Sequence, residues 1–320
     1  MEHKLDVALI GEALMLLIAN QPGPLALVES FSKRTAGAET NVAIGLSRLG
    51  FSVGWASRLG NDSMAQYLLS TILAEHIDCS RVVCDPTQQT GFMFKGKVLD
   101  GSDPPVEYHR KGSAASHLGA KDIDVLWLQS CRHLHATGIF PALSSDTLAA
   151  THRSFDVVRS SGSTISFDPN LRLALWPSVE KMLFEVNTLS ARADWLFPGL
   201  EEGRMLTGLT APEEIAIFYR NLGAKLVVIK LGPAGAYFDS PNATGYVAGC
   251  PVSKVVDTVG AGDAFAVGAI SALLEGKSVN SAVERASWIG ARAVEVRGDT
   301  EGLPTREFLD SNFHCPVKTF

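Results

Sequence analysis

The sequence predicts an α/β protein with a Rossmann-type parallel sheet at its core and helices on both faces of that sheet. After Asp122, apolar runs of strand length alternate with stretches of helical periodicity, and this alternation is typical of parallel sheets covered on both faces. The 320 residues are 46% hydrophobic and 19% charged, which is ordinary for a globular enzyme with a sizeable core. Two segments, 13–36 and 90–111, interrupt the alternation, and we expect them to pair into a small separate sheet.

Short apolar runs and turn-forming residues place each element in order along the chain. The first strand is expected at 7–11, and the first long helix, at 40–49, has apolar residues at helical spacing and ends at Gly50. In the interrupting segments, strands are expected at 14–19, 31–36, 90–99 and 106–110, with a turn at 101–105. The remaining core strands are expected at 53–57, 133–137, 164–168, 195–197 and 225–230, followed by a hairpin at 234–239 and 245–248. The remaining helices are expected from a cap at 61–63 to about 75, and at 144–161, 178–191, 211–222, 260–274 and 279–295, before an irregular tail at 313–320.

Composition narrows the class of protein. The net charge of -6 argues against nucleic acid and against an anionic membrane surface as partners. The apolar stretch 7–19 is too short to span a bilayer, and acidic residues at 6 and 12 argue against a signal peptide. Five cysteines, without a CxxC pair or zinc spacing, stand at 79, 84, 131, 250 and 315. Because such a scattered, odd set suits a reducing compartment, we expect a cytoplasmic enzyme.

The stretch 257–265, Asp-Thr-Val-Gly-Ala-Gly-Asp-Ala-Phe, carries the strongest functional signal. Gly260, Ala261 and Gly262 open the helix expected at 260–274, so their N–H groups point out of a helix N-terminus and suit an anion. Asp263 follows at once and suits a general base that takes a proton from a hydroxyl attacking a phosphate. Phe265 stands where a Rossmann fingerprint needs its third glycine, and the chain has no Walker A loop. A glycine-rich turn that merely opens a packed helix is the alternative.

This string resembles the C-terminal signature of the ribokinase-like (PfkB) carbohydrate kinases. The segment 36–43, Ala-Gly-Ala-Glu-Thr-Asn-Val-Ala, with Gly50 and Gly60 downstream, resembles the N-terminal signature of the same family. The resemblance implies that the backbone of Gly37 approaches a sugar and that Asn41 contacts its hydroxyl groups. Without the resemblance, the polar residues of this segment are also compatible with a helix cap.

Residues 107–116, Glu-Tyr-His-Arg-Lys-Gly-Ser-Ala-Ala-Ser, end the first hairpin. On a strand, Tyr108 and Arg110 share a face, and an aromatic ring beside a guanidinium suits a sugar acid, because the arginine can bind the carboxylate. The segment resembles the Y-Y-R-x-G-S-A-A-S stretch of the 2-keto-3-deoxygluconate kinases in this family. However, His109 replaces the second tyrosine, and Met93 stands where that branch places a substrate tyrosine. A neutral sugar therefore stays an alternative substrate. An exposed strand with ordinary charges is the alternative interpretation.

Residues 168–176 resemble the family pattern D-x-N-x-R-x-x-L-W, which implies that Arg172 reaches the substrate or the transferring phosphoryl group. The same residues are also turn formers. Glu202 stands at the glutamate of an N-x-x-E motif that the family ties to magnesium, but Gly199 replaces the asparagine. We therefore expect Glu202 to act on Mg²⁺ indirectly, through water. A solvated charge at a helix start is the alternative interpretation.

Three residues of 230–235, Lys230, Gly232 and Gly235, resemble the K-x-G-x-x-G segment that borders ATP in the family. Ser287 stands where many relatives have an asparagine on the adenine side. Residues 297–302 resemble a stretch that closes the nucleotide end in the sugar-acid kinases. The resemblance therefore implies a nucleotide site built from the last third of the chain.

Taken together, these segments imply a ribokinase-like fold with a core over 1–12, 37–89 and 112–310 and a β-sheet lid over 13–36 and 90–111. They imply ATP- and Mg²⁺-dependent phosphorylation of 2-keto-3-deoxygluconate (2-dehydro-3-deoxy-D-gluconate), or a close sugar acid, at its terminal hydroxyl. They also imply a homo-oligomer that pairs through the lids. A kinase of a neutral sugar or a nucleoside is the alternative, and a kinase-fold protein that binds ligands without turnover is a remoter one.

Overall fold

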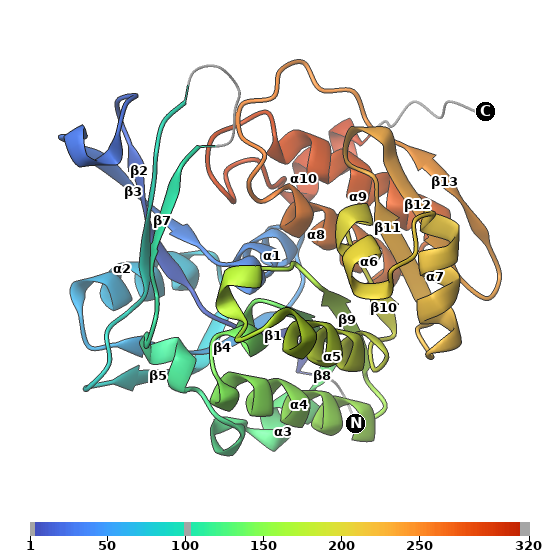
Figure 1. Cartoon of the computed structure of the whole chain (residues 1–320), viewed down its shortest axis with the longest axis horizontal. Helices are drawn as coiled ribbons and strands as arrows, with labels where there is room; N and C mark the ends of the chain where they lie inside the picture. Colours follow the sequence, from blue (N-terminus) through green and yellow to red (C-terminus); the bar gives the residue numbers. More distant parts are fainter. Residues whose placement is uncertain (1–3, 99–103, 314–320) are drawn as a thin grey trace.

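The computed structural model describes residues 4–98 and 104–313, and its main layer is a nine-stranded sheet (Figure 1). Its strands are β1 (Leu5–Ile10), β4 (Val53–Gly60), β5 (Asp78–Asp85), β8 (Cys131–Thr137), β9 (Thr164–Asp168), β10 (Trp195–Leu196), β11 (Leu226–Lys230), β12 (Gly235–Asp239) and β13 (Thr244–Ala248). Their order is β13-β12-β11-β10-β9-β8-β1-β4-β5. Neighbours from β11 to β5 are parallel, whereas β12 is antiparallel to β11 and β13. The predicted parallel core is therefore confirmed.

Helices cover both faces of this sheet, as predicted, and bury two apolar clusters. One cluster packs the sheet against α1 (Ala38–Arg48), α2 (Ser63–Ala74), α8 (Ala261–Leu274), α9 (Val279–Ala293) and α10 (Arg306–Asn312). The other packs the sheet against α3 (Val125–Gln129), α4 (Ser145–Ser160), α5 (Val179–Ser190), α6 (Leu200–Thr207) and α7 (Pro212–Asn221). Within 4–98 and 104–313, no helix has the length and apolar content to cross a membrane.

Some elements lie in stretches for which the sequence predicts none, namely β5, α3, α6 and α10. β5 is an edge strand whose side chains are mostly at least partly exposed, so it lacks an apolar alternation. The helices α3, α6 and α10 span five, eight and seven residues, which is too short to establish a helical period. The turn expected at 101–105 and the tail expected at 313–320, with Cys315, fall mostly outside the described residues.

The two interrupting segments form a four-stranded small sheet, as predicted. Its strands are β2 (Leu14–Ala19), β3 (Phe31–Ala36), β6 (Phe92–Lys95) and β7 (Val106–His109), in the order β3-β2-β6-β7. One face carries a buried apolar cluster that includes Leu14, Leu16 and Met93. The small sheet stands at one side of the core, on the same side as α2 (Figure 1).

The chain leaves the centre of the main sheet in two directions, and this places the ligand-binding edge. β1 and β8 are neighbours, with β4 and β5 on one side and β9 to β11 on the other. In open α/β sheets, ligands bind beyond the carboxyl ends of the strands at such a switch point. Glu12 follows β1 there, and Asp168, the first residue of the 168–176 segment, ends β9, so polar residues from distant parts of the chain meet at one edge of the sheet.

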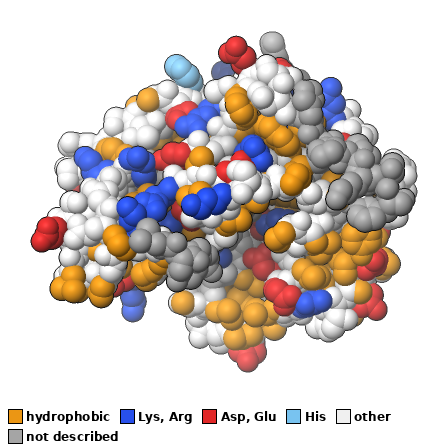
Figure 2. Space-filling model, turned by 90° about the horizontal axis from the view of Figure 1, so that it is seen from above, with side chains coloured by type: hydrophobic (Ala, Val, Ile, Leu, Met, Phe, Trp, Pro, Cys, Tyr) orange, Lys and Arg blue, Asp and Glu red, His pale blue; other side chains and the backbone are white. Residues whose placement is uncertain are grey.

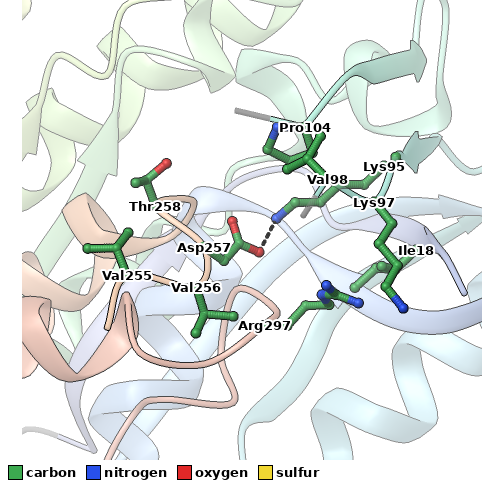
Figure 3. A pocket seen from close by; sticks show the side chains of 11 residues that line it. Ile18, Lys95, Lys97, Val98, Pro104, Val255, Val256, Asp257, Thr258 and Arg297 are labelled. Carbon is green, nitrogen blue, oxygen red and sulfur yellow. Dashed lines mark hydrogen bonds and ion pairs between the residues drawn. The ribbon is translucent and has the colours of Figure 1, made fainter. Parts of the chain in front are cut away.

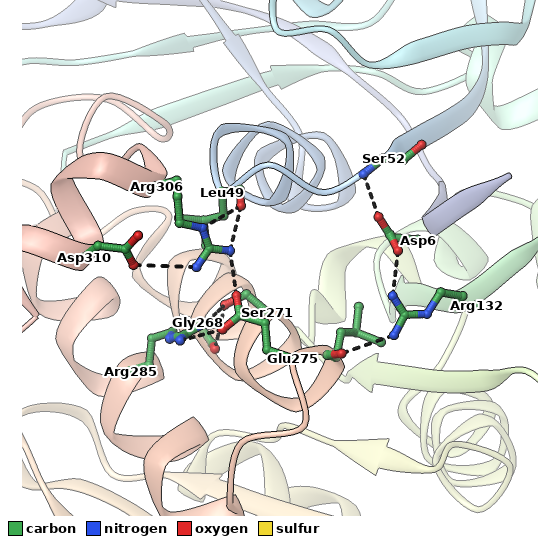
Figure 4. Close-up of polar contacts among 11 residues, drawn as sticks. Asp6, Leu49, Ser52, Arg132, Gly268, Ser271, Glu275, Arg285, Arg306 and Asp310 are labelled. Carbon is green, nitrogen blue, oxygen red and sulfur yellow. Dashed lines mark hydrogen bonds and ion pairs between the residues drawn. The ribbon is translucent and has the colours of Figure 1, made fainter. Parts of the chain in front are cut away.

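Helix α8 is fixed at its C-terminal end by a group of charged residues (Figure 4). Glu275, just after the helix, accepts from Arg285 at 2.8 Å and from Arg306 at 2.6 Å. Arg306 also donates to Leu49 O beyond the end of α1, and Arg132 of β8 donates to the last carbonyl of α8 at 3.2 Å. These bonds tie α8 to three other elements, so the position of its N-terminus follows from the core.

Candidate active site

A cavity of about 420 Å³ lies at the switch point, between the core and the inner face of the small sheet. Seen from above, a recess separates the half of the surface that carries the small sheet from the other half, and Lys and Arg side chains gather beside it (Figure 2). The sequence-predicted residues that line the cavity are Gly37, Asn41, Tyr108, Arg110, Arg172, Glu202, Lys230, Gly260, Gly262 and Asp263. The fold therefore brings together residues that lie far apart in the chain.

A second cavity, of about 320 Å³, lies on the other side of the α8 N-terminus and is mostly apolar. The remaining predicted residues line it, namely Gly232, Gly235, Ala261 and Ser287. Ser287 Oγ is buried and has no hydrogen-bond partner among the described residues. Lys230, Thr258 and Gly262 line both cavities, so the two spaces meet where α8 begins.

Asp263 lies at this meeting point, in the first turn of α8, and is 8% exposed. Its Oδ2 accepts from Asn41 Nδ2 at 2.8 Å, and its Oδ1 lies 3.5 Å from Asn170 Nδ2. Burial raises the pKa of Asp263 to about 8, the hydrogen bond from Asn41 opposes this rise, and the charge of Asp168 adds to it. A carboxyl group with this pKa changes protonation state near neutral pH, as a general base should.

The glycines before Asp263 give α8 an open N-terminus. Gly260 is the N-cap, with a left-handed backbone at φ 83°, which favours glycine. A Cβ at this position would lie 2.8 Å from the carbonyl oxygen of Asp299. First-turn amides of a helix have no acceptor within the helix, although the Ala261 N–H makes a long bond, 3.4 Å, to Thr258 O. The amides of this turn can therefore bind an anion that enters from either cavity.

Lys230 places a positive charge beside this turn. Its Nζ lies 2.6 Å from Asp168 Oδ2, and a Cβ on Gly262 would lie 3.5 Å from the same nitrogen. Burial lowers the pKa of Lys230, but the charges of Asp168 and Glu202 outweigh burial and raise it. Burial raises the pKa of Asp168 to about 6, against the effect of Lys230. The lysine is therefore a charged group at the junction of the cavities.

Glu202 has a structural task in addition to its place in the cavity wall. Its Oε2 accepts from the Gly199 N–H and its Oε1 from the Leu171 N–H, both at 2.7 Å. The first bond caps α6 and the second orients the loop that carries Arg172. The structure thus agrees with the alternative of a charge at a helix start, and an additional role of Glu202 beside a metal stays a prediction.

The two arginines of the first cavity differ in how they are bound. Arg110 is paired with Glu12, at 2.7 Å from Nε and 2.5 Å from Nη2, and Ser113 donates to the other oxygen of Glu12. Its guanidinium also lies 5.8 Å from the ring centroid of Tyr108. Arg172, by contrast, is exposed and donates to the neighbouring Leu171 O. Arg172 is therefore the arginine with more freedom to bind a ligand.

Three further charged residues belong to the site or adjoin it, namely Glu39, Asp299 and Lys95. Glu39, on α1, is buried and accepts from Thr137 at 2.6 Å, and burial raises its pKa to about 7. Asp299 lines the first cavity, and burial raises its pKa to about 6. Glu39 lies inside the 36–43 segment and Asp299 inside the 297–302 segment. Both segments resemble motifs of the family, but the resemblance assigns no role to these two residues. Lys95, described below, had no motif at all.

Comparison with known proteins places this geometry in a family. The sequence profile of the pfkB family of carbohydrate kinases matches residues 4–306. The 2-dehydro-3-deoxygluconokinase of Bacillus subtilis (strain 168) is 48% identical over 96% of this chain and 95% of its own. That of Thermoproteus tenax is 33% identical over 95% and 93% of the two chains, and fructokinase-1 of Zea mays is 30% identical over 93% and 94%.

Solved structures agree with this family. The PfkB protein from Polaromonas sp. JS666 has a TM-score of 0.89 and 62% identity, over 96% of this chain and 99% of its own. A protein named ribokinase II from Escherichia coli, solved in complex with ATP and Mg²⁺, has a TM-score of 0.88 and 27% identity, over 96% and 98%. The similarity covers both sheets, because it extends over nearly the whole chain.

The pKa of Asp263 leads to a prediction about stability. Its carboxyl keeps its proton up to a pH of about 8 in the folded protein, but only up to about 3.8 in the unfolded chain. The folded state therefore binds more protons between these values, and this carboxyl lowers stability as pH rises through the interval. We expect the free energy of unfolding of Asp263→Asn, relative to that of wild type, to increase from pH 4 to pH 8 and to stay constant above pH 8.

Free energies of unfolding from urea titrations at a series of pH values measure this difference. Asp146→Asn, which changes an exposed carboxyl on α4, is the control. A difference between Asp263→Asn and wild type that stays constant from pH 4 to 8 would contradict the pKa of Asp263.

Proposed function

The chain belongs to the pfkB family of carbohydrate kinases, and we propose that it transfers the γ-phosphoryl group of ATP to the terminal hydroxyl of 2-keto-3-deoxygluconate or a close sugar acid. The observation that carries this proposal is the position of Asp263 between two cavities of different character. The polar cavity under the small sheet suits the acceptor, and the apolar cavity beside Ser287 suits the adenine end of ATP. Next to Asp263, Gly262 and Lys230 line both cavities, so a carboxylate, helix amides and a lysine lie together at their junction.

In the proposed reaction, Asp263 accepts the proton of the terminal hydroxyl. The alkoxide oxygen then forms a bond to the γ-phosphorus, and the bond from that phosphorus to the β-phosphate oxygen breaks, which leaves ADP. Amides of Gly260 and Gly262 and the ammonium of Lys230 stabilise the negative charge of the transferring group, because these residues line the cavities where the two meet. The proton stays on Asp263 until product leaves.

Mg²⁺ accompanies ATP in this family, and the donor set of the site suits an ion held mostly by phosphates and water. Asp168 and Glu202 already bind Lys230 and backbone N–H groups, and among the described residues no group of three His, Cys, Asp or Glu is placed to hold a metal. We propose that Glu202 contacts the ion through water, as Mg²⁺ usually keeps several waters. When bound, the ion neutralises charge on the β- and γ-phosphates.

For the acceptor, Arg172 is the proposed ligand of the carboxylate, with Tyr108 packing against the carbon chain. Arg110 contributes less net charge than the sequence implies, because Glu12 neutralises it. Gly37 and Asn41 line the same cavity and are the proposed contacts for hydroxyl groups. The pairing of Arg110 and the presence of Met93 in the cavity wall favour a neutral sugar as the second candidate acceptor.

We further propose that the small sheet is a lid that excludes water during transfer, and that two lids pair in a homo-oligomer. The support is an aromatic outer face on the sheet, formed by Phe31, Phe92 and Phe94, with His109 stacked on Phe92 at 4.6 Å. Phe92 and Phe94 alternate with Met93 along β6, so they point away from the cavity.

A cytoplasmic location is also proposed, because the reaction consumes ATP.

The role of Asp263 predicts the behaviour of Asp263→Asn. Because the variant keeps an acceptor for Asn41 but cannot take a proton, kcat is expected to fall by roughly 10²–10⁴ with little change in KM. In wild type, kcat/KM is expected to rise with pH and level off above about 8, since protonated Asp263 is inactive. A coupled ADP assay measures both, and near-normal turnover in the variant would refute the assignment.

The role of Arg172 predicts a change that depends on the substrate. Loss of a charged hydrogen bond costs about 1.5–3 kcal/mol, so Arg172→Ala is expected to raise KM for the sugar acid by about 10- to 100-fold and to leave KM for ATP nearly unchanged. Arg153→Ala, on α4 and outside both cavities, is the control.

The same assay over sugar acids, hexoses, pentoses and nucleosides tests the substrate class, and a preference for fructose or ribose would favour the second candidate.

The aromatic outer face predicts an assembly that a single change disrupts. Light scattering after size exclusion is expected to return a multiple of the 34.2 kDa chain mass. Phe94→Asp, which puts a charge on the outer face, is expected to return the monomer, whereas Leu126→Asp, at a 78% exposed position on α3, is expected to change nothing. A monomeric wild-type protein at assay concentration would exclude pairing through the lids.

A further inference from the structure

Lys95 is a buried cation that joins the small sheet to the core. It ends β6, where it shares the inner face with Met93 because side chains alternate along a strand. Its Nζ lies 2.6 Å from Asp257 Oδ2 and 3.8 Å from Asp299 Oδ1, and its side chain is 2% exposed (Figure 3). None of the functions described above uses this ammonium group, although a buried charge is stable only when it is paired.

Both partners of Lys95 frame the turn that opens α8. Asp257 Oδ1 accepts from the Val259 N–H at 3.2 Å, and Asp257 Oδ2 also lies 3.4 Å from the Gly298 N–H. The backbone of Asp299 packs against Gly260 so closely that a Cβ there would approach to 2.8 Å. One carboxylate therefore holds the chain entering the Gly260 turn, and the other belongs to the segment on which that turn rests.

Without the ammonium, the charges of these two carboxylates would repel each other, since burial raises the pKa of Asp299 and the charge of Asp257 raises it further. Asp299 Oδ1 is buried and has no hydrogen-bond partner among the described residues, so the charge of Lys95 at 3.8 Å is what compensates it. The cavity beside Lys95 measures about 20 Å³ and has room for little more than a water molecule. Repulsion between Asp257 and Asp299 would therefore be relieved by movement of the turn between them.

From this arrangement we infer that Lys95 is a positioning residue for phosphoryl transfer. Its ammonium, carried by the small sheet, neutralises the two carboxylates that frame the Gly260 turn and so holds the anion-binding amides in their working geometry. The inference rests on the proposed kinase function. It adds that the sheet above the acceptor cavity also orders the residues that bind the phosphates.

Lys95→Ala tests this role, with Arg34→Met as the matched control. Arg34 joins β3 of the same sheet to Glu301, in the same segment as Asp299, at 2.8 Å, but its side chain is 49% exposed. Lys95→Ala is expected to lower kcat by about 10- to 100-fold, as displacement of reacting groups does, with KM for the sugar acid changed less than about threefold. Arg34→Met is expected to keep wild-type kcat, since exposed ion pairs contribute little.

Chemical rescue separates positioning from loss of structure. Propylammonium has the atoms that Lys95→Ala removes, and it is expected to restore part of kcat in that variant. Tetramethylammonium, which has no N–H donor, is expected to restore none at the same ionic strength. Equal effects of the two ions, a kcat within twofold of wild type, or a loss that follows the folded fraction measured by circular dichroism would overturn the inference.

Two further measurements keep the test decisive. If Lys95→Ala does not fold, Lys95→Met keeps most of the apolar volume of the side chain but not its charge, and it is expected to fold with a reduced kcat; wild-type kcat in it would overturn the inference. Calorimetric titration with Mg²⁺ and a non-hydrolysable ATP analogue needs no sugar acid. Weaker binding by about tenfold is expected in Lys95→Ala and not in Arg34→Met, so an error in the assigned acceptor would not be mistaken for an error about Lys95.

Discussion

The burial of several carboxylates around one helix N-terminus is the constraint on which this structure depends. Asp168, Asp257, Asp263 and Asp299 are each less than 9% exposed, and a charge in such a place is stable only with a counter-charge or a proton. Lys230 supplies the counter-charge from a core strand, and Lys95 supplies it from the small sheet. Among the described residues, Asp263 has the helix N-terminus and Asn41 as neighbours but no ion pair, and burial raises its pKa to about 8, against about 6 for Asp168 and for Asp299.

This distribution of charges suits Asp263 to the proposed role of general base. A carboxylate paired directly with a lysine would be a weak base, because the lysine would stabilise its charged form. The lysines here pair with the neighbours of Asp263 instead, so they offset part of the negative charge of the site while Asp263 retains its affinity for a proton. The ion pairs of Glu275 with Arg285 and Arg306 fix the C-terminal end of α8, and this keeps Asp263 in position relative to the two lysines.

The sequence predicts local structure and local motifs well, and partnerships across the chain poorly. The parallel core follows from strong periodicity, and the turn at 257–265 from a string whose chemistry is contained within nine residues. Arg110 was expected to bind substrate, but Glu12 lies 98 residues away and nothing local shows that the two pair. Lys95 and Asp257 are 162 residues apart. In the local sequence, a lysine on the inner face of an apolar strand indicates a buried cation, but it does not show which carboxylate pairs with it.

The long reach of Lys95 also bears on how the protein is made. Its strand leaves the ribosome well before residues 257–299 exist, because synthesis runs from the N-terminus. Until those residues arrive, the nascent small sheet has an ammonium on its inner face with no carboxylate to receive it, and burial of that face is unfavourable. Burial of this face therefore becomes favourable only after residues 257–299 have been made, so the small sheet docks on the core late in synthesis.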